Sequence, residues 1–208
     1  MNDRLVERTL RAFSDDLASA AAVPGGGSAA AYSGAMGAAL AAMVGRIAER
    51  KESSEATATL IAEADNLRAD FIRLVDDDSA AYARVSEAMK LPKASTEEKK
   101  VRAERMQSAL LAASRVPLEI AKTSRRLLDL CERTVERAAS ATVSDVGVGA
   151  LLAETALRGA ALNVMINLAS VKDAAQVKAL SEDLDLAVDG ADAQRKRITD
   201  FVESRIAR

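Results

Sequence analysis

The residues that could do chemistry in this sequence do not include histidine, because the chain has none. A run of three glycines, Gly25, Gly26 and Gly27, is followed directly by Ser28. Glycines let backbone N–H groups approach a ligand closely, although the same run can also serve only as a turn. We expect a tight ligand-binding loop here, with Ser28 capping the helix that follows.

Two aspartates, Asp78 and Asp145, are candidates for acid/base chemistry. Asp78 falls on the apolar stripe of a predicted helix, where a carboxylate is costly to bury unless it is hydrogen-bonded, paired or functional. Its neighbours Asp76 and Asp77 fall on the solvated side of the same helix. We predict that Asp78 or Asp145 is catalytic; the alternatives are a structural role for the first and helix capping for the second.

Two asparagines, Asn163 and Asn167, lie one helical turn apart on a face of small residues. Each side-chain amide needs several hydrogen-bond partners, which is more than a helical core normally provides. The pair therefore either orients a bound substrate or joins neighbouring helices by hydrogen bonds. Both interpretations stay open at the level of the sequence.

The composition excludes several classes of function. The 29 Lys and Arg residues and 31 Asp and Glu residues are mixed along the chain, so we expect neither a nucleic-acid surface nor a polybasic membrane patch. Without histidine the usual metal ligand is missing, and we expect no metal and no cofactor. A single cysteine, Cys131, excludes an internal disulfide, and the charged first residues do not form a signal sequence. We therefore expect a cytoplasmic protein.

The elements that must position these residues are helices, because apolar residues recur at steps of three and four throughout the chain. The predicted helices span about residues 3–20, 28–49, 54–90, 95–137, 144–168 and 173–208. We expect caps at Ser53 or Ser54, Ser95, Ser144 and Asp173, and a kink or break at Pro117. Residues 1–208 are thus predicted to form a single all-α domain, an up-down bundle of about six helices.

The second predicted helix consists almost wholly of Ala, Gly, Ser and Met. The stretch from Leu17 to Gly45 carries no charge, so a membrane span is an alternative interpretation. Small residues contribute little transfer energy, and Pro24 with the glycines after it interrupts the run. We therefore expect a buried helix to which neighbouring helices can come close, and no membrane partner.

The up-down arrangement predicts which candidates meet. With a rise of about 1.5 Å per residue, the glycine segment, the first aspartate and the two amides come level at one end of the bundle. Asp145 precedes Asn163 by 18 residues, or roughly 27 Å along the helix, and so lies at the opposite end with Arg50 and Lys51. One chain cannot place both groups in one small site.

Several motifs occur in a fixed order along nearly the whole chain. They are Pro24-Gly-Gly-Gly-Ser-Ala-Ala-Ala, Gly34-Ala-Met-Gly-Ala-Ala-Leu, Asp78-x-x-Ala-Tyr82, Leu91-Pro92-Lys93, Val116-Pro117-Leu118, Ser144-Asp145-Val-Gly-Val-Gly and Ala161-Leu-Asn-Val-Met-Ile-Asn-Leu168. Together they resemble the cyclodeaminase/cyclohydrolase family of folate one-carbon metabolism. The resemblance implies a helical homodimer that hydrolyses methenyltetrahydrofolate to formyltetrahydrofolate. The alternatives are a formiminotetrahydrofolate cyclodeaminase and a non-catalytic dimer that binds a folate or a protein partner.

The resemblance also implies roles for the candidate residues. Gly25 to Ser28 would approach the folate, Asn163 and Asn167 would orient it, and Arg50 and Lys51 would bind its glutamate carboxylates from the other subunit of an antiparallel dimer. Two segments depart from the family pattern. Ala138-Ala139 and Ala141 stand where a Gly-Asn pair and a second Asn are usual, and Glu49-Arg50-Lys51-Glu52-Ser53 replaces a Gly-Lys-Lys-x-Tyr segment. These departures affect the expected substrate contacts and leave the expected fold unchanged.

Overall fold

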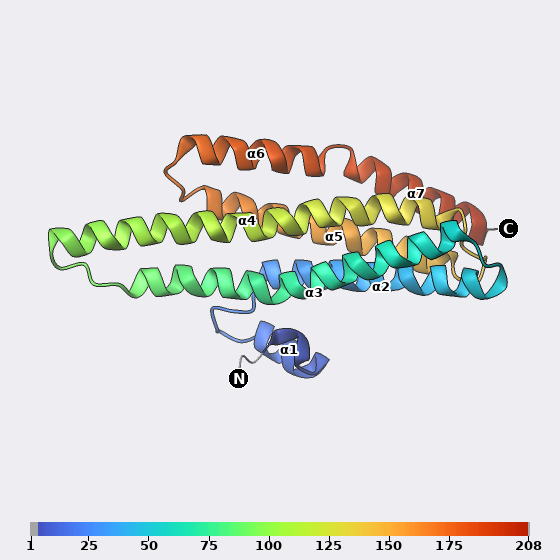
Figure 1. Ribbon diagram of the computed structural model, residues 1–208, viewed down its shortest axis with the longest axis horizontal. Helices are drawn as coiled ribbons and strands as arrows, with labels where there is room; N and C mark the ends of the chain where they lie inside the picture. Colours follow the sequence, from blue (N-terminus) through green and yellow to red (C-terminus); the bar gives the residue numbers. More distant parts are fainter. Residues whose placement is uncertain (1–3, 208) are drawn as a thin grey trace.

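The computed structural model describes residues 4–207, and within this range all regular secondary structure is helical (Figure 1). A short 3-10 helix, Leu5–Glu7, precedes seven α-helices: α1 (Leu10–Leu17), α2 (Gly26–Lys51), α3 (Glu55–Lys90), α4 (Thr96–Val135), α5 (Val143–Leu168), α6 (Ala174–Val188) and α7 (Ala191–Ile206). The prediction of an all-α chain is therefore confirmed.

Helices α2 to α5 form a four-helix bundle in which consecutive helices run in opposite directions (Figure 1). In this view α3 and α4 lie in front of α2 and α5, and each helix packs on its two neighbours. Helices α6 and α7 lie along α4 and α5. The α3–α4 hairpin projects past the start of α2, so the start of α2 faces the middle of α3 and not its end.

Small residues allow α2 to pack closely against α3 and α5. A Cβ atom added at Gly37 would lie 2.9 Å from the Gly149 carbonyl oxygen of α5, and one at Gly34 would lie 2.5 Å from Cζ of Phe71 in α3. Length and composition alone would allow α2 and α5 to cross a membrane, yet 67% and 44% of their most apolar windows are buried inside the protein. Close backbone packing explains why these helices need so little side-chain volume.

The N-terminal segment differs from the prediction of one helix over residues 3–20. Its expected start at Asp3 lies outside the described residues. Within them, Leu5–Glu7 and α1 are separated because the backbone at Arg8 and Thr9 is extended. Thr9 then caps α1 by accepting a hydrogen bond from the Ala12 N–H.

The helix starts that were predicted from capping residues are confirmed in three cases. Ser54 caps α3, Ser95 caps α4 in a complete capping box with Glu98, and Asp173 caps α6. Two predictions were wrong: α2 begins after Gly25, so Ser28 lies inside its first turn, and α5 begins after Thr142, so Ser144 is helical. The residues that precede these two helices, Gly25 and Thr142, make no side-chain capping hydrogen bond.

The last predicted helix, over residues 173–208, is two helices. Gly190 has φ of +65°, a left-handed conformation that ends α6 and turns the chain into α7. Residue 208 lies outside the described range. Conversely, α4 is one continuous helix with Pro117 inside it, so of the expected kink or break the break does not occur.

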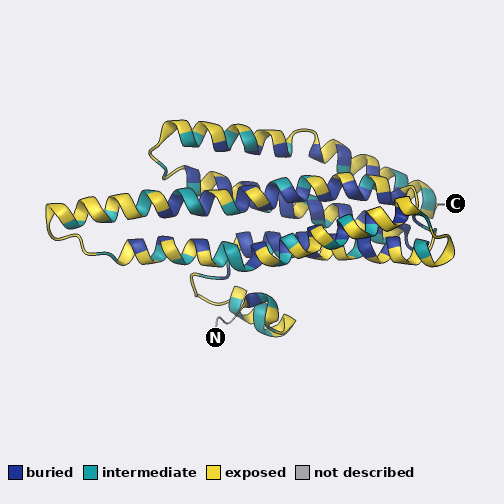
Figure 2. Ribbon diagram, viewed as in Figure 1, coloured by how far each residue is buried: buried dark blue, intermediate teal, exposed yellow. Residues whose placement is uncertain are grey.

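Burial along α3 follows the predicted stripe completely only in its first part. Leu60, Leu67, Phe71 and Leu74 are buried there. Farther along, Val85 is buried against α4, but Tyr82 and Met89 are 40% and 54% exposed. Figure 2 shows the reason, since buried positions become sparse where the hairpin extends past α2 and α5. No second layer of helices covers that part of α3.

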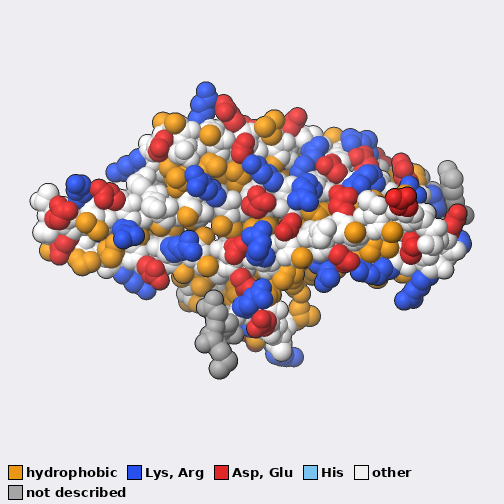
Figure 3. Space-filling view, in the orientation of Figure 1, with side chains coloured by type: hydrophobic (Ala, Val, Ile, Leu, Met, Phe, Trp, Pro, Cys, Tyr) orange, Lys and Arg blue, Asp and Glu red, His pale blue; other side chains and the backbone are white. Residues whose placement is uncertain are grey.

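The outer surface differs from one side of the bundle to another. On the face shown in Figure 3, acidic and basic side chains alternate over α3, α4, α6 and α7. The outward sides of α2 and α5 instead expose large apolar residues, namely Met36, Met43, Ile47, Val148, Leu151, Leu162, Met165 and Ile166. These eight residues define the apolar face of α2 and α5.

Candidate functional site

A cleft of about 210 Å³ lies where α2 begins. The start of α2 contributes Gly25, Gly26 and Gly27, α3 contributes Asp78 and Tyr82, and α5 contributes Asn163, Ile166 and Asn167. Residues that the sequence separates by up to 142 positions, from Gly25 to Asn167, thus meet at one level of the bundle. The glycines, Asp78 and the two asparagines therefore lie at the same level of the bundle, as the helix-rise argument predicted.

The glycines bring the start of α2 directly onto the Asp78 carboxylate. A Cβ atom at Gly27 would lie 2.5 Å from Cγ of Asp78, closer than real Cβ contacts allow. At Gly26 the added atom would lie 3.3 Å from Nδ2 of Asn163. The backbone of Gly27 therefore forms one wall of the site. The prediction of a loop was wrong, because Gly26 and Gly27 belong to the first turn of α2.

Ser28 lies behind this wall and holds the carboxylate in place. Its side chain is fully buried, and its Oγ atom lies 3.0 Å from Oδ2 of Asp78, from Oγ of Ser79 and from the Val75 carbonyl oxygen. The expected direct contact between Ser28 and a ligand is not available in this position. Its contribution to the site passes through Asp78.

Burial raises the pKa of the Asp78 carboxyl above the ordinary value for aspartate. Hydrogen bonds from the hydroxyl and the backbone N–H of Ser28 act in the opposite direction, because they stabilise the ionised form. The burial effect is the larger one. A carboxyl whose pKa is shifted toward neutrality in a cleft is suited to accept and return a proton.

The two asparagines are each held by one hydrogen bond to a main-chain carbonyl. Nδ2 of Asn163 donates to the Gly159 oxygen at 2.8 Å, and Nδ2 of Asn167 donates to the Ala113 oxygen of α4 at 2.8 Å. Within residues 4–207, no protein donor bonds either side-chain oxygen. Only the Asn167 bond joins neighbouring helices, because Gly159 lies one turn before Asn163 in the same helix α5. The side-chain oxygens of both amides remain available as acceptors, so the structure leaves a role in substrate binding open for each.

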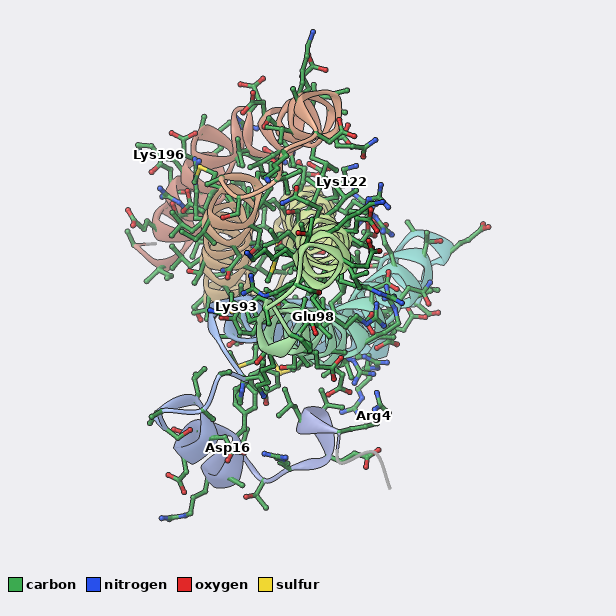
Figure 4. All side chains as sticks on the ribbon, turned by 90° about the vertical axis from the view of Figure 1, so that its left-hand side faces the viewer. Arg4, Asp16, Lys93, Glu98, Lys122 and Lys196 are labelled. Atoms are coloured by element: carbon green, nitrogen blue, oxygen red, sulfur yellow. The ribbon has the colours of Figure 1, made fainter. Side chains whose placement is uncertain are left out.

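The N-terminal segment reaches the same region of α3 from outside. Oδ1 of Asp76 accepts a hydrogen bond from the Leu5 N–H at 2.8 Å, and Oδ2 pairs with Nε of Arg4 at 2.9 Å. The prediction that Asp76 is merely solvated was therefore wrong, whereas Asp77 pairs with Arg73 at the surface. Figure 4 shows Arg4 directed toward the bundle while Asp16 lies on α1 away from it.

The remaining candidates lie at the opposite end of the bundle, where α2 ends and α5 begins (Figure 1). Arg50 lines a hollow of about 440 Å³ together with Arg46 and Arg68, and Lys51 lines one of about 640 Å³. Asp145 is in the first turn of α5, half-buried. The structure therefore separates these three residues from the Asp78 cleft, as the helix-rise argument predicted.

Sequence reasoning missed Ser79, whose hydroxyl completes the group around Ser28. The sequence indicated this role only by a hydroxyl residue directly after Asp78, at the level of the glycines. Nothing in the sequence indicated the contact with the Val75 carbonyl, because every residue of a helix has a backbone carbonyl. Among residues 4–207, no cluster of three or more Cys, Asp or Glu side chains could hold a metal ion.

Residues 4–207 thus form an all-α protein with a cleft lined by one half-buried carboxylate and two amides. The sequence matches the profile of the formiminotransferase-cyclodeaminase family over residues 9–186. It is also 39% identical, over 202 residues, to a methenyltetrahydrofolate cyclohydrolase from Methylorubrum extorquens, covering 95% of this chain and 97% of that protein. The chain belongs to the formiminotransferase-cyclodeaminase family.

Two further relatives cover other branches of the family. The formimidoyltransferase-cyclodeaminase of Sus scrofa is 36% identical over 98% of this chain, which spans only 38% of that longer protein. A crystal structure of formiminotetrahydrofolate cyclodeaminase from Thermotoga maritima superposes with a TM-score of 0.83 at 25% identity, covering 95% of this chain and 97% of that chain. The family resemblance stated from the motifs is confirmed.

Proposed function

We propose that this protein hydrolyses methenyltetrahydrofolate to formyltetrahydrofolate. The observation that carries the proposal is the Asp78 carboxyl, placed in a cleft beside two amides in a chain similar over nearly its full length to a methenyltetrahydrofolate cyclohydrolase. The substrate carbon is already cationic, so water can add to it once a base removes a proton from that water. A carboxylate also stabilises the cation before the addition.

In the proposed mechanism Asp78 accepts the proton of the attacking water as the carbon–oxygen bond forms. It then returns the proton to one ring nitrogen as the carbon–nitrogen bond breaks. The new hydroxyl group releases its proton to solvent in the same step, which opens the ring and leaves the formyl group on the other nitrogen. The side-chain oxygens of Asn163 and Asn167 accept hydrogen bonds from N–H groups of the pterin. The exposed backbone of Gly25 and Gly26 lets the ring approach closely.

The second candidate function is cyclodeamination of formiminotetrahydrofolate, favoured by the similarity to the Thermotoga maritima structure. Here Asp78 would instead protonate the departing ammonia. The third, from another class, is a dimer that binds folate without turnover, and its motivation is the loss of the usual Asn residues at positions 138–141.

The experiment that separates these functions measures turnover of both folates by one preparation, with calorimetry on a stable folate analogue. We expect hydrolysis of methenyltetrahydrofolate with the larger kcat/KM. Turnover of the formimino compound alone would establish the second function. Binding without turnover of either compound would establish the third.

We further propose a homodimer with two shared sites. The apolar face of α2 and α5 is the support, because side chains such as Leu162 (65% exposed) and Ile166 (69% exposed) are costly to leave in water. This face runs from the Asp78 cleft to the end carrying Arg50 and Asp145. An antiparallel two-fold pairing would bring that second end onto the partner's cleft, where Arg50 and Lys51 would bind the glutamate carboxylates.

Hybrid dimers test the shared site. An Asp145→Ala chain mixed with an Asn163→Ala chain gives hybrids in which one of the two sites has all its native residues. We expect each homodimer to be impaired and the hybrids to regain about half of the native activity. Confirmed hybrid dimers with no recovered activity would show that each site is contained in one chain.

The remaining expectations are also part of the proposal. We propose a cytoplasmic enzyme that needs no metal and no cofactor and that binds neither nucleic acid nor a membrane. The support is the chain's lack of histidine and the mixture of acidic and basic side chains on the face shown in Figure 3. Burial raises the pKa of the Cys131 thiol to about 12, so this residue is suited to core packing and not to nucleophilic chemistry.

A further inference from the structure

Ser28 is a fully buried hydroxyl with more oxygen neighbours than it has protons. Its Oγ atom lies 3.0 Å from each of Oδ2 of Asp78, Oγ of Ser79 and the carbonyl oxygen of Val75. A serine hydroxyl has one proton to donate and two lone pairs that accept. The carbonyl can only accept, Ser79 can do either, and what the carboxyl does depends on its protonation.

The two protonation states of Asp78 require different arrangements of these protons. When Asp78 is ionised it is an acceptor only, so Ser28 donates to it and in turn accepts from Ser79. When Oδ2 of Asp78 carries a proton, that proton is donated to Ser28, whose own proton turns to the Val75 carbonyl. A rotation of one hydroxyl therefore preserves the hydrogen bond to Asp78 in both states.

We propose that Ser28 is a positioning residue for acid/base chemistry at Asp78, acting as a hydroxyl that reverses its hydrogen bond as the carboxyl takes up and releases its proton. This inference rests on the proposed function, which requires Asp78 to pass through both states in each turnover. Ser79 supports the ionised state by donating to Ser28. Neither serine touches the substrate.

No charged side chain other than Asp78 lines the described part of the cleft, so Ser28 is the group that responds to its protonation. Helix α2 has no charged residue from Gly26 to Gly45. The parts of α4 and α5 that line the cleft are uncharged. On α3, Asp76 is paired with Arg4 and Asp77 with Arg73, and among the described residues lining the cleft Tyr82 is the only other titratable side chain.

The test is a titration of Asp78 in the Ser28→Ala variant. A hydrogen bond to an ionised carboxylate is stronger than one to the neutral acid, so its removal favours the protonated form. We expect the pKa of Asp78 to rise by about one further unit, read from the carboxyl ¹³C chemical shift and from the acidic limb of kcat/KM. Ser79→Ala should raise it by less, because that hydroxyl acts on Asp78 only through Ser28.

Ser33→Ala is the matched control. Ser33 is also a buried serine of α2, and its hydroxyl donates to the Leu152 carbonyl of α5 at 3.0 Å, away from Asp78. We expect no shift of the Asp78 titration in this variant. A Ser28→Ala titration that is unchanged, moves downward or matches that of Ser33→Ala would overturn the inference. Because the ¹³C titration needs no turnover, it decides the role of Ser28 even if the proposed reaction is not found.

Discussion

Replacing Asp78 by asparagine is expected to lower kcat by about 10²-fold or more, the loss typical of a positioned acid/base group. Asparagine has nearly the same shape and can still accept the hydrogen bond from Ser28, so the fold should be retained. What it cannot do is take a proton from water at neutral pH. Steady-state kinetics on the two proteins, together with their circular dichroism, measures both parts of this expectation.

The stability of the same variant has a defined pH dependence. Burial raises the pKa of Asp78, so this carboxyl ionises less readily in the folded protein than in the unfolded chain. Its ionisation therefore lowers the free energy of unfolding. The wild-type protein should therefore lose stability relative to Asp78→Asn as the pH rises from the ordinary aspartate pKa through the raised one. At neutral pH the variant is expected to unfold at an equal or higher temperature.

Asp77→Asn is the control on the neighbouring residue. Asp77 pairs with Arg73 at the surface and does not line the cleft, so its replacement should leave kcat unchanged. Wild-type turnover by Asp78→Asn would remove Asp78 from the mechanism. A parallel loss of activity in both variants would point to a nonspecific effect of charge on this helix.

Gly27→Ala is expected to reduce turnover to nearly the level of Asp78→Asn while changing the free energy of unfolding by less than about 1 kcal/mol. The added Cβ atom needs the space that the Asp78 carboxyl occupies. This carboxyl can rotate into the adjacent cleft, so the backbone need not move. Kinetics and urea unfolding of the same preparation would measure the two effects.

Two other glycine substitutions make this prediction specific. Gly25→Ala meets no atom within 4 Å and should leave stability nearly unchanged. Gly34→Ala meets the ring of fully buried Phe71, which cannot move freely, and should cost about 1–3 kcal/mol. If Gly27→Ala instead lost stability as Gly34→Ala does and kept its turnover per folded molecule, the wall of the site would have been assigned wrongly.

The sequence predicted the helices and their meeting points because both depend on regular geometry. Asp78 and Asn163 could be brought level from residue counts alone, since a helix rises by a fixed amount per residue. The caps at Ser54, Ser95 and Asp173 could be predicted because a capping hydrogen bond joins residues that are only two or three positions apart. Gly190 also had a signal, but the apolar spacing around it was regular enough to suggest one continuous helix.

What the sequence could not predict depends on contacts between helices. Ser28 resembles a helix cap, yet neighbouring α3 supplies the hydrogen-bonding groups that draw its side chain inward. Asp76 resembles a solvated carboxylate, yet Leu5 and Arg4 bond to it from 71 and 72 residues away. Tyr82 and Met89 continue the apolar spacing of α3, yet both are exposed, and they lie past the point where α2 begins.

The positions of the two tyrosines make them natural optical reporters. The chain has no tryptophan, so its fluorescence on excitation near the tyrosine absorption band comes from Tyr32 and Tyr82. Tyr82 lines the cleft, and a bound pterin would quench it by energy transfer. Tyr32 packs against Phe13 of α1, with ring centroids 5.6 Å apart, and would sense whether the N-terminal segment is docked. Without any introduced label, a Tyr32→Phe variant would thus report occupancy of the cleft through Tyr82, and a Tyr82→Phe variant would report docking of the N-terminal segment through Tyr32.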